Sequence, residues 1–108
     1  MQPDPIATDV ESARDRTVPS GGHIVRSYSL RRDGHSARAS WEIETQLAWS
    51  TYVEWVEPRL GEYGLAERGR DRLRFTRQLE GDVYTLLLIA KPGAARQTIE
   101  ASFEATPF

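Results

Sequence analysis

Residues 51–63 read TYVEWVEPRLGEY, and this stretch decides the fold because apolar side chains recur in it at helical spacing. Thr51 and Glu54 fit a capping box at its start, with Ser50 as an alternative cap. Pro58 predicts a kink, or a short helix followed by a second turn, because proline cannot donate a hydrogen bond inside a helix. We therefore predict an amphipathic helix over Thr51–Tyr63, whose buried stripe would comprise Tyr52, Val53, Val56, Leu60 and Tyr63.

The residues before this helix, 23–45, predict a β-hairpin. Asp33-Gly34 is a strong signal for a two-residue type I′ turn. A register set by that turn alone separates the side chains by polarity, as a half-buried hairpin requires, with Arg26 as the exception. The apolar face would then carry Ile24, Tyr28, Leu30, Ala37, Ala39, Trp41 and Ile43.

The residues after the helix, 65–105, predict further hairpins by the same alternation of polarity. Gly81-Asp82 is a two-residue turn signal, and Pro92–Ala95 would form the next loop. These loops would pair Phe75 with Leu88 and, in the next hairpin, Leu88 with Ile99. A short strand over Leu65–Arg68 is the least supported element. The inward side chains would be Leu73, Phe75, Leu79, Tyr84, Leu86, Leu88, Ile99, Ala101 and Phe103.

This order of elements, β-β-α-β-β-β-β, predicts an α+β fold in which one antiparallel sheet of hairpins packs on one helix in two layers. The alternative is a sheet that wraps further round the helix, as in helix-grip or cystatin-like folds. Residues 23–108 would form this single α+β domain. Residues 1–22 would be a flexible N-terminal tether, since prolines and glycines interrupt them and large apolar residues are few. One helical turn over Asp9–Arg16, docked on a partner, is the alternative for this segment.

Composition excludes several classes of protein. With 108 residues, 39% of them hydrophobic and 28% charged, the chain has the make-up of a soluble globular domain. A net charge of −2 argues against a dedicated nucleic-acid binder, and no apolar run approaches the roughly 18 residues that cross a bilayer. Cysteine is absent, which excludes disulfides and thiolate chemistry. With no signal peptide in the sequence, we expect a cytoplasmic protein; the alternative is a periplasmic mature domain whose signal has been removed.

No set of residues forms a recognisable catalytic, metal or cofactor motif, so we expect a protein that is not an enzyme. His23 and His35 are the only histidines, and metal sites need several ligands at fixed spacing. The arginines between Arg68 and Arg77 could bind an anion. The favoured interpretation is that they pair across the sheet with carboxylates, the candidates being Glu67, Glu100 and Glu104.

One expected strand is apolar on both faces, and this is the strongest functional signal. If Leu86 and Leu88 point into the core, Val83, Leu87 and Ile89 point outward, where polar side chains are expected. We therefore predict an interaction or accessory subunit that binds a protein partner, or a second copy, through the outer sheet face. The candidate partner-binding residues are Val83, Leu87, Ile89, Arg74 and Trp55, because tryptophan is enriched at binding hot spots.

A small-ligand binder is the alternative function. Small side chains such as Ala37, Ala39 and Ala101 could leave room for a pocket between the helix and the sheet, or could simply admit the helix. Such a pocket would be lined by Trp41, Trp55, Tyr84 and Phe103.

A resemblance in spacing bears on where the protein resides. Trp41, Trp49, Tyr52 and Trp55, with residues 81–84 and the closing residues 103–108, resemble small exported bacterial domains that are carried on a lipid-anchored tether. No lipobox cysteine or signal is present, so the resemblance implies a trimmed sequence.

Overall fold

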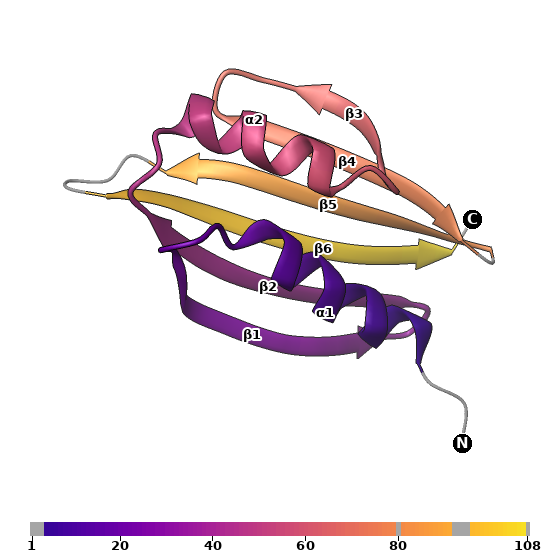
Figure 1. Ribbon diagram of the computed structural model, residues 1–108. Helices are drawn as coiled ribbons and strands as arrows, with labels where there is room; N and C mark the ends of the chain where they lie inside the picture. The colour runs from indigo at the N-terminus through magenta and orange to yellow at the C-terminus, as the bar shows by residue number, and fades with distance from the viewer. Residues whose placement is uncertain (1–3, 80, 92–95, 108) are drawn as a thin grey trace.

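A six-stranded antiparallel sheet carries two helices on one of its faces (Figure 1). The structure is a computed structural model, and it describes residues 4–79, 81–91 and 96–107. The strand order in the sheet is β1-β2-β6-β5-β4-β3. The expected α+β fold and order of elements along the chain are confirmed, with an additional helix before the first strand. The elements are α1 (Pro5–Thr17), β1 (His23–Asp33), β2 (Ser36–Thr45), α2 (Trp49–Arg59), β3 (Gly64–Arg68), β4 (Arg72–Leu79), β5 (Asp82–Lys91) and β6 (Gln97–Pro107).

The core lies between the helices and the inner face of the sheet. Strands β2, β5 and β6 bury every second side chain, because successive side chains of a strand point to opposite faces. The inward residues predicted for β2, β4, β5 and β6 are confirmed, except that Leu79 is only partly buried. Buried strand residues of this core include Ala37, Ala39, Trp41, Ile43, Leu73, Phe75, Tyr84, Leu86, Leu88, Ile99, Ala101 and Phe103.

The two C-terminal hairpins keep the predicted faces but not the predicted partners. Phe75 pairs with Leu86 rather than Leu88, and Leu79 pairs with Asp82. The predicted loop Gly81-Asp82 is therefore wrong by one position; Gly81 itself has a positive φ of 87°. Leu88 pairs with Ala101 in the next hairpin, again two residues from the expected partner, and the predicted loop over 92–95 lies outside the described residues. A displacement of two leaves every side chain on its own face.

The first hairpin departs further from the prediction. Asp33 pairs with Ser36, so Gly34, with a φ of 63°, occupies the loop together with His35. Two register shifts, one between Tyr28 and Arg31 and one between Ile24 and Arg26, change the pairing along β1. Beyond both shifts Ile24 pairs with Ile43, which is the pairing that an Asp33-Gly34 loop predicts. Tyr28 is consequently 55% exposed, and the expectation that it belongs to the core is wrong.

Helix α2 confirms the predicted stripe and corrects its cap. Tyr52, Val56 and Leu60 are buried at 0–1% exposure. The helix begins at Trp49, with Ala48 as a cap that makes no side-chain hydrogen bond, so the capping box at Thr51 is wrong. It ends at Arg59, one residue after Pro58, which agrees with the expected short helix because an internal proline removes a helical hydrogen bond and crowds the preceding turn.

The expectation of a flexible tether is wrong for Pro5–Thr17, which form helix α1. The carboxylate of Asp4 caps this helix by accepting the Ile6 N–H at 3.0 Å, and Pro5 occupies a first-turn position where its missing N–H costs nothing. Its buried residues are Val10, Ala13 and Thr17. Two of these three are small or polar, and a count of large apolar residues overlooks such a helix.

Thr17 joins helix α1 to both β2 and α2. The indole Nε1 of Trp41 donates to its hydroxyl at 3.0 Å, and the hydroxyl of Tyr52 donates to its carbonyl at 2.6 Å. The Thr17 hydroxyl in turn donates to the carbonyl of Arg14 at 3.1 Å. Because Thr17 is fully buried, these bonds satisfy polar groups that would otherwise be costly to remove from water.

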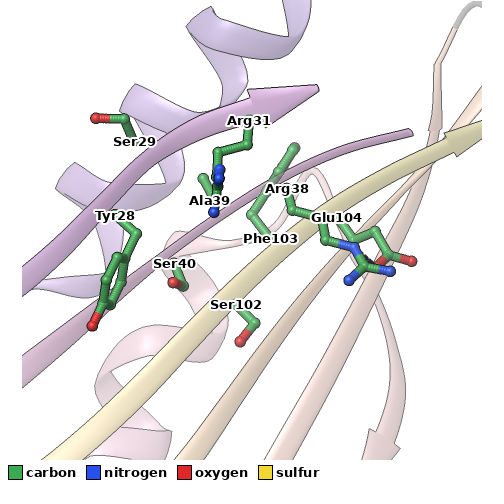
Figure 2. A pocket seen from close by; sticks show the side chains of 9 residues that line it. All are labelled: Tyr28, Ser29, Arg31, Arg38, Ala39, Ser40, Ser102, Phe103 and Glu104. Atoms are coloured by element: carbon green, nitrogen blue, oxygen red, sulfur yellow. Dashed lines mark ion pairs between the residues drawn. The ribbon is translucent and has the colours of Figure 1, made fainter. Parts of the chain in front are cut away.

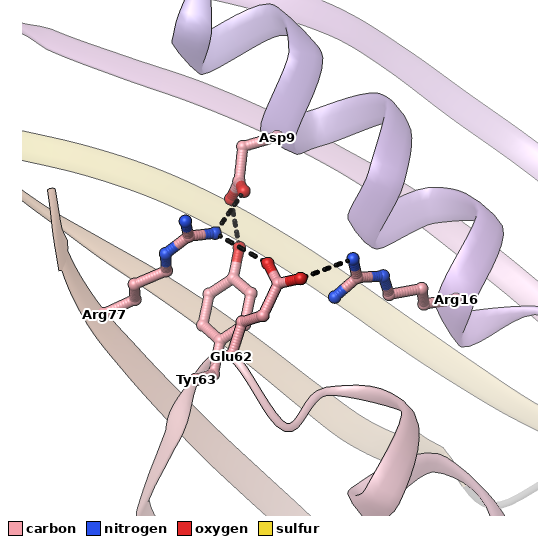
Figure 3. A network of polar contacts seen from close by, with 5 residues as sticks. All are labelled: Asp9, Arg16, Glu62, Tyr63 and Arg77. Atoms are coloured by element: carbon pink, nitrogen blue, oxygen red, sulfur yellow. Dashed lines mark hydrogen bonds and ion pairs between the residues drawn. The ribbon is translucent and has the colours of Figure 1, made fainter.

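A polar network joins helix α1 to the segment that follows α2 and to strand β4 (Figure 3). Asp9 accepts hydrogen bonds from the Tyr63 hydroxyl and, at 2.9 Å, from Arg77. Glu62 pairs with Arg16 at 2.9 Å and with Arg77 at 3.1 Å, and the Arg16 hydrogen bond lowers the pKa of Glu62. Burial raises the pKa of the Tyr63 hydroxyl, and the contact with Asp9 acts in the same direction. The network fixes the position of α1 over the sheet.

Candidate interaction surface

Strand β5 places apolar side chains on the face of the sheet opposite the helices. Val83, Leu87 and Ile89 alternate with the buried residues Tyr84, Leu86 and Leu88, and they are partly buried. They do not belong to the core cluster or to the partly buried residues packed against it. We call these three residues the apolar ridge. Both helices lie on the other side of the sheet, so no described element covers the ridge (Figure 1).

Arginines of strand β4 border one side of the ridge. Arg72 pairs in register with Ile89, and Arg74 pairs with Leu87. Both arginines reach Glu67 on β3 only at long range, 4.0 and 3.9 Å. At that separation and at their exposure, these ion pairs contribute little to the free energy of unfolding, so the guanidinium groups remain available to a partner.

Carboxylates of strand β6 border the other side. Glu100 pairs in register with Ile89, and Glu104 with Thr85. Lys91 approaches Glu100 at 2.8 Å, and this hydrogen bond raises the pKa of Lys91. The next strand places Glu42 directly opposite Glu100, a like-charge pair that disfavours the isolated face. The ridge therefore separates a cationic border from an acidic one.

The structure does not bring Trp55 together with the other four candidate partner-binding residues. Trp55 lies on α2, on the helical side of the sheet, where the Arg59 guanidinium sits 4.6 Å from the centroid of its ring. The Tyr52 ring is 5.8 Å away on the other flank. Val83, Leu87, Ile89 and Arg74 share the outer face, whereas Trp55 is partly buried on the helical side and packs against the core.

Three residues of the alternative ligand pocket belong to the buried core, and the fourth, Trp55, packs against that core from α2. Trp41, Tyr84 and Phe103 are each 1% exposed. The rings of Tyr84 and Phe103 pack at 5.5 Å between centroids, and the Arg14 guanidinium lies 5.5 Å from the Trp41 ring centroid. Together with the Thr17 bond to Trp41, these contacts describe a packed core rather than a vacant cavity.

The remaining charged candidates pair within the protein. Arg68 contacts Glu57 on α2, and Arg77 belongs to the network around Asp9. The favoured pairing of the arginine stretch with Glu67 is confirmed for Arg72 and Arg74. Within residues 4–79, 81–91 and 96–107, no group of three or more metal-ligating side chains comes together.

Sequence reasoning overlooked a hollow on the outer face, over β1, β2 and β6 (Figure 2). Its volume is about 490 Å³. The signal that could have found it is the pair of serines at outward positions, Ser40 and Ser102, which are paired in register and leave space between longer neighbours. Tyr28, Ser29, Arg31, Arg38 and Glu104 also line the hollow.

Comparison with known proteins gives one distant likeness. No known protein family matches the chain, and no curated protein is similar to it. A solved structure described as "Crystal structure of LpqN involved in cell envelope biogenesis of Mycobacterium tuberculosis" is similar with a TM-score of 0.47 and 9% sequence identity. The match covers 83% of this chain and 68% of that one.

In the part of the chain that the structure describes, no helix is long and apolar enough to cross a bilayer.

Proposed function

We propose that this chain is a non-enzymatic interaction or accessory subunit, which binds a protein partner or a second copy of itself through the outer sheet face. The observation that carries the proposal is the apolar ridge on a face that no described element covers. An uncovered row of apolar side chains exposes hydrocarbon to water, and burial against a partner removes that cost at roughly 25 cal/mol per Å².

The borders of the ridge define the kind of partner that fits. A partner would present an apolar patch flanked on one side by carboxylates, which face Arg72 and Arg74. On the other side it would meet Glu100 and Glu104, which already pair with Lys91 and Arg38, so polar groups suffice there. Interfaces commonly combine such an apolar centre with a polar rim. The charges would govern orientation and the rate of association, and the ridge would contribute most of the affinity.

The test is the paired change Leu87→Thr and Ile89→Thr, made in the same chain. Threonine keeps the β-propensity of the strand and removes the apolar contact. If each residue acts as a hot spot worth about 2 kcal/mol and the two contributions add, binding should weaken by roughly several hundredfold. Light scattering reports the mass of the purified protein. Affinity capture from the native organism shows which partners bind the unaltered chain but not the variant.

The matched control is the paired change Val25→Thr and Leu65→Thr. These residues are both 45% exposed on edge strands, outside the ridge, so the control alters as many apolar side chains without touching the surface under test. Loss of self-association or of a captured partner in the ridge variant alone supports the proposal. Unchanged mass and unchanged partners in the ridge variant contradict it.

A further inference from the structure

The hollow over β1, β2 and β6 has a composition that the apolar ridge does not explain. Two rows of outward side chains cross the three strands in register. The first row is Tyr28, Ser40 and Ser102, and the second is Arg31, Arg38 and Glu104. An aromatic ring and two hydroxyls thus lie beside two guanidinium groups and one carboxylate, around a space of about 490 Å³ (Figure 2).

Local backbone structure creates the hollow. The register shift between Tyr28 and Arg31 changes the spacing of the two rows on β1, and such bulges re-aim side chains at the edges of sheets. Tyr28 is thereby turned out of the core and left 55% exposed. Ser40 and Ser102 have short side chains. The longer side chains of Tyr28 and of the second row therefore extend further from the sheet and surround the space above the two serines.

The charges in the hollow are unbalanced. Arg31 and Arg38 face each other across neighbouring strands, and like charges at that position destabilise a sheet. Arg38 pairs with Glu104 at 2.9 Å. The Arg31 side chain makes no ion pair or hydrogen bond with any residue that the structure describes. Arg31 and Arg38 also line an adjoining hollow, together with Arg32 and Asp33. Arg32 forms an ion pair with Asp4, the residue that caps α1.

We propose that this hollow binds a small organic oxyanion, a molecule with a phosphate or carboxylate group attached to a flat apolar part. The forked guanidinium of Arg31 matches either oxyanion in two parallel hydrogen bonds, and the anion relieves its repulsion with Arg38. The hydroxyls of Ser40 and Ser102 supply further donors. The ring of Tyr28 packs against the apolar part of the ligand. The hollow adjoins the apolar ridge, since Ser102 pairs in register with Leu87, but the contacts proposed for the anion do not involve Val83, Leu87 or Ile89.

The test is a titration of the ¹⁵N-labelled full chain with phenyl phosphate, followed by amide chemical shifts. Saturable shifts are expected at Arg31, Ser40 and Ser102, with a dissociation constant in the millimolar range or tighter. Arg31→Gln should weaken binding by about tenfold or more, because it removes a charge-assisted bond. The matched control, Arg70→Gln, makes the same charge change at an exposed arginine outside the hollow and should leave binding unchanged.

Two further probes separate the parts of the proposal. Benzoate in place of phenyl phosphate distinguishes a carboxylate from a phosphate site, and binding of either one supports the proposal. Inorganic phosphate should bind several-fold more weakly than phenyl phosphate, and Tyr28→Ala should remove that difference. The proposal is overturned if neither aromatic anion shifts the hollow residues. It is also overturned if Arg31→Gln and Arg70→Gln weaken binding equally, since that result indicates attraction by net charge alone.

Discussion

The two faces of the sheet are formed by the same strands, yet they differ in what covers them. On the inner face, Trp41, Leu86 and Leu88 are 1% exposed or less beneath the two helices. On the outer face, their immediate neighbours along the chain remain in contact with solvent, and the ridge keeps apolar side chains there. The comparison shows that the core forms on the helix-covered face and leaves out the ridge. The second apolar set on β5 is the surface that the proposed interaction would use.

The largest effect should come from removing helix α1. Deletion of residues 1–18 would expose Trp41 and Tyr52 and leave the Trp41 N–H and Tyr52 O–H without their bonds to Thr17. We expect loss of cooperative unfolding, measured by thermal melting with near-ultraviolet circular dichroism as the probe of core packing. A truncated chain that melts like the full chain would show that the inner face of the sheet does not need α1.

The change Trp41→Ala should lower the free energy of unfolding by about 3–5 kcal/mol, as large aromatic truncations in cores do. Ser40→Ala, one residue along β2 and on the outer face, should change it by less than about 0.5 kcal/mol. Urea unfolding measures both. Similar losses in the two variants would remove the distinction between the faces.

High pH should destabilise the inner face specifically. Burial raises the pKa of the Tyr52 hydroxyl above its usual value, as it does for Tyr63. The stabilising contribution of such a group is complete below the unfolded pKa of about 10 and is lost as the pH rises above it. Above that pH, Tyr52 alone should lower the free energy of unfolding by about 1.4 kcal/mol per pH unit. Urea unfolding across this range tests the slope, and Tyr52→Phe, which cannot ionise, should reduce it.

A smaller loss is expected when the Thr17 hydroxyl is removed. Thr17→Val keeps the shape of the side chain but leaves the buried Trp41 N–H unpaired, at a cost of about 1–3 kcal/mol. Thr8→Val makes the same change at an exposed position of the same helix and should have little effect. Equal melting temperatures for the two variants would contradict the role given to Thr17.

The smallest effect on stability is expected on the outer face. Leu87→Thr with Ile89→Thr should lower the free energy of unfolding by under about 1 kcal/mol, because neither side chain belongs to the core cluster. Thermal melting beside light scattering separates stability from association. A large fall in melting temperature with unchanged mass would place the ridge in an internal core.

The sequence identified the faces of the strands better than their partners. Polarity alternates with a period of two, so it assigns Phe75, Leu86 and Ala101 to the core correctly even when the hairpin is displaced by two residues. Alternation cannot detect such a displacement, because both registers place the same side chains inward. The first hairpin was misjudged near its turn because the bulges on β1 break the period, which is why Tyr28 was assigned to the core.

Helix α1 could have been read from its cap rather than from its hydrophobicity. Asp4 followed by Pro5 is a typical helix start, and Val10, Ala13 and Thr17 follow at helical spacing. The role of Thr17 depends on its tertiary contacts with Trp41 and Tyr52, which no local pattern reveals. For the same reason the sequence placed four residues of the ridge and its border together but could not show that Trp55 lies on the opposite side.

The long sequence separation of the α1 contacts has a consequence for synthesis in the cell. Asp9 is 68 residues from Arg77, and Thr17 is 35 residues from Tyr52. At typical translation rates of about 5–20 residues per second, the nascent helix waits between about 3 and 14 s for its last anchoring residue. During that interval Val10 and Ala13 have no core to enter. The emerging chain is therefore most vulnerable to proteases and to non-native association at α1, which is synthesised before all of its long-range partners.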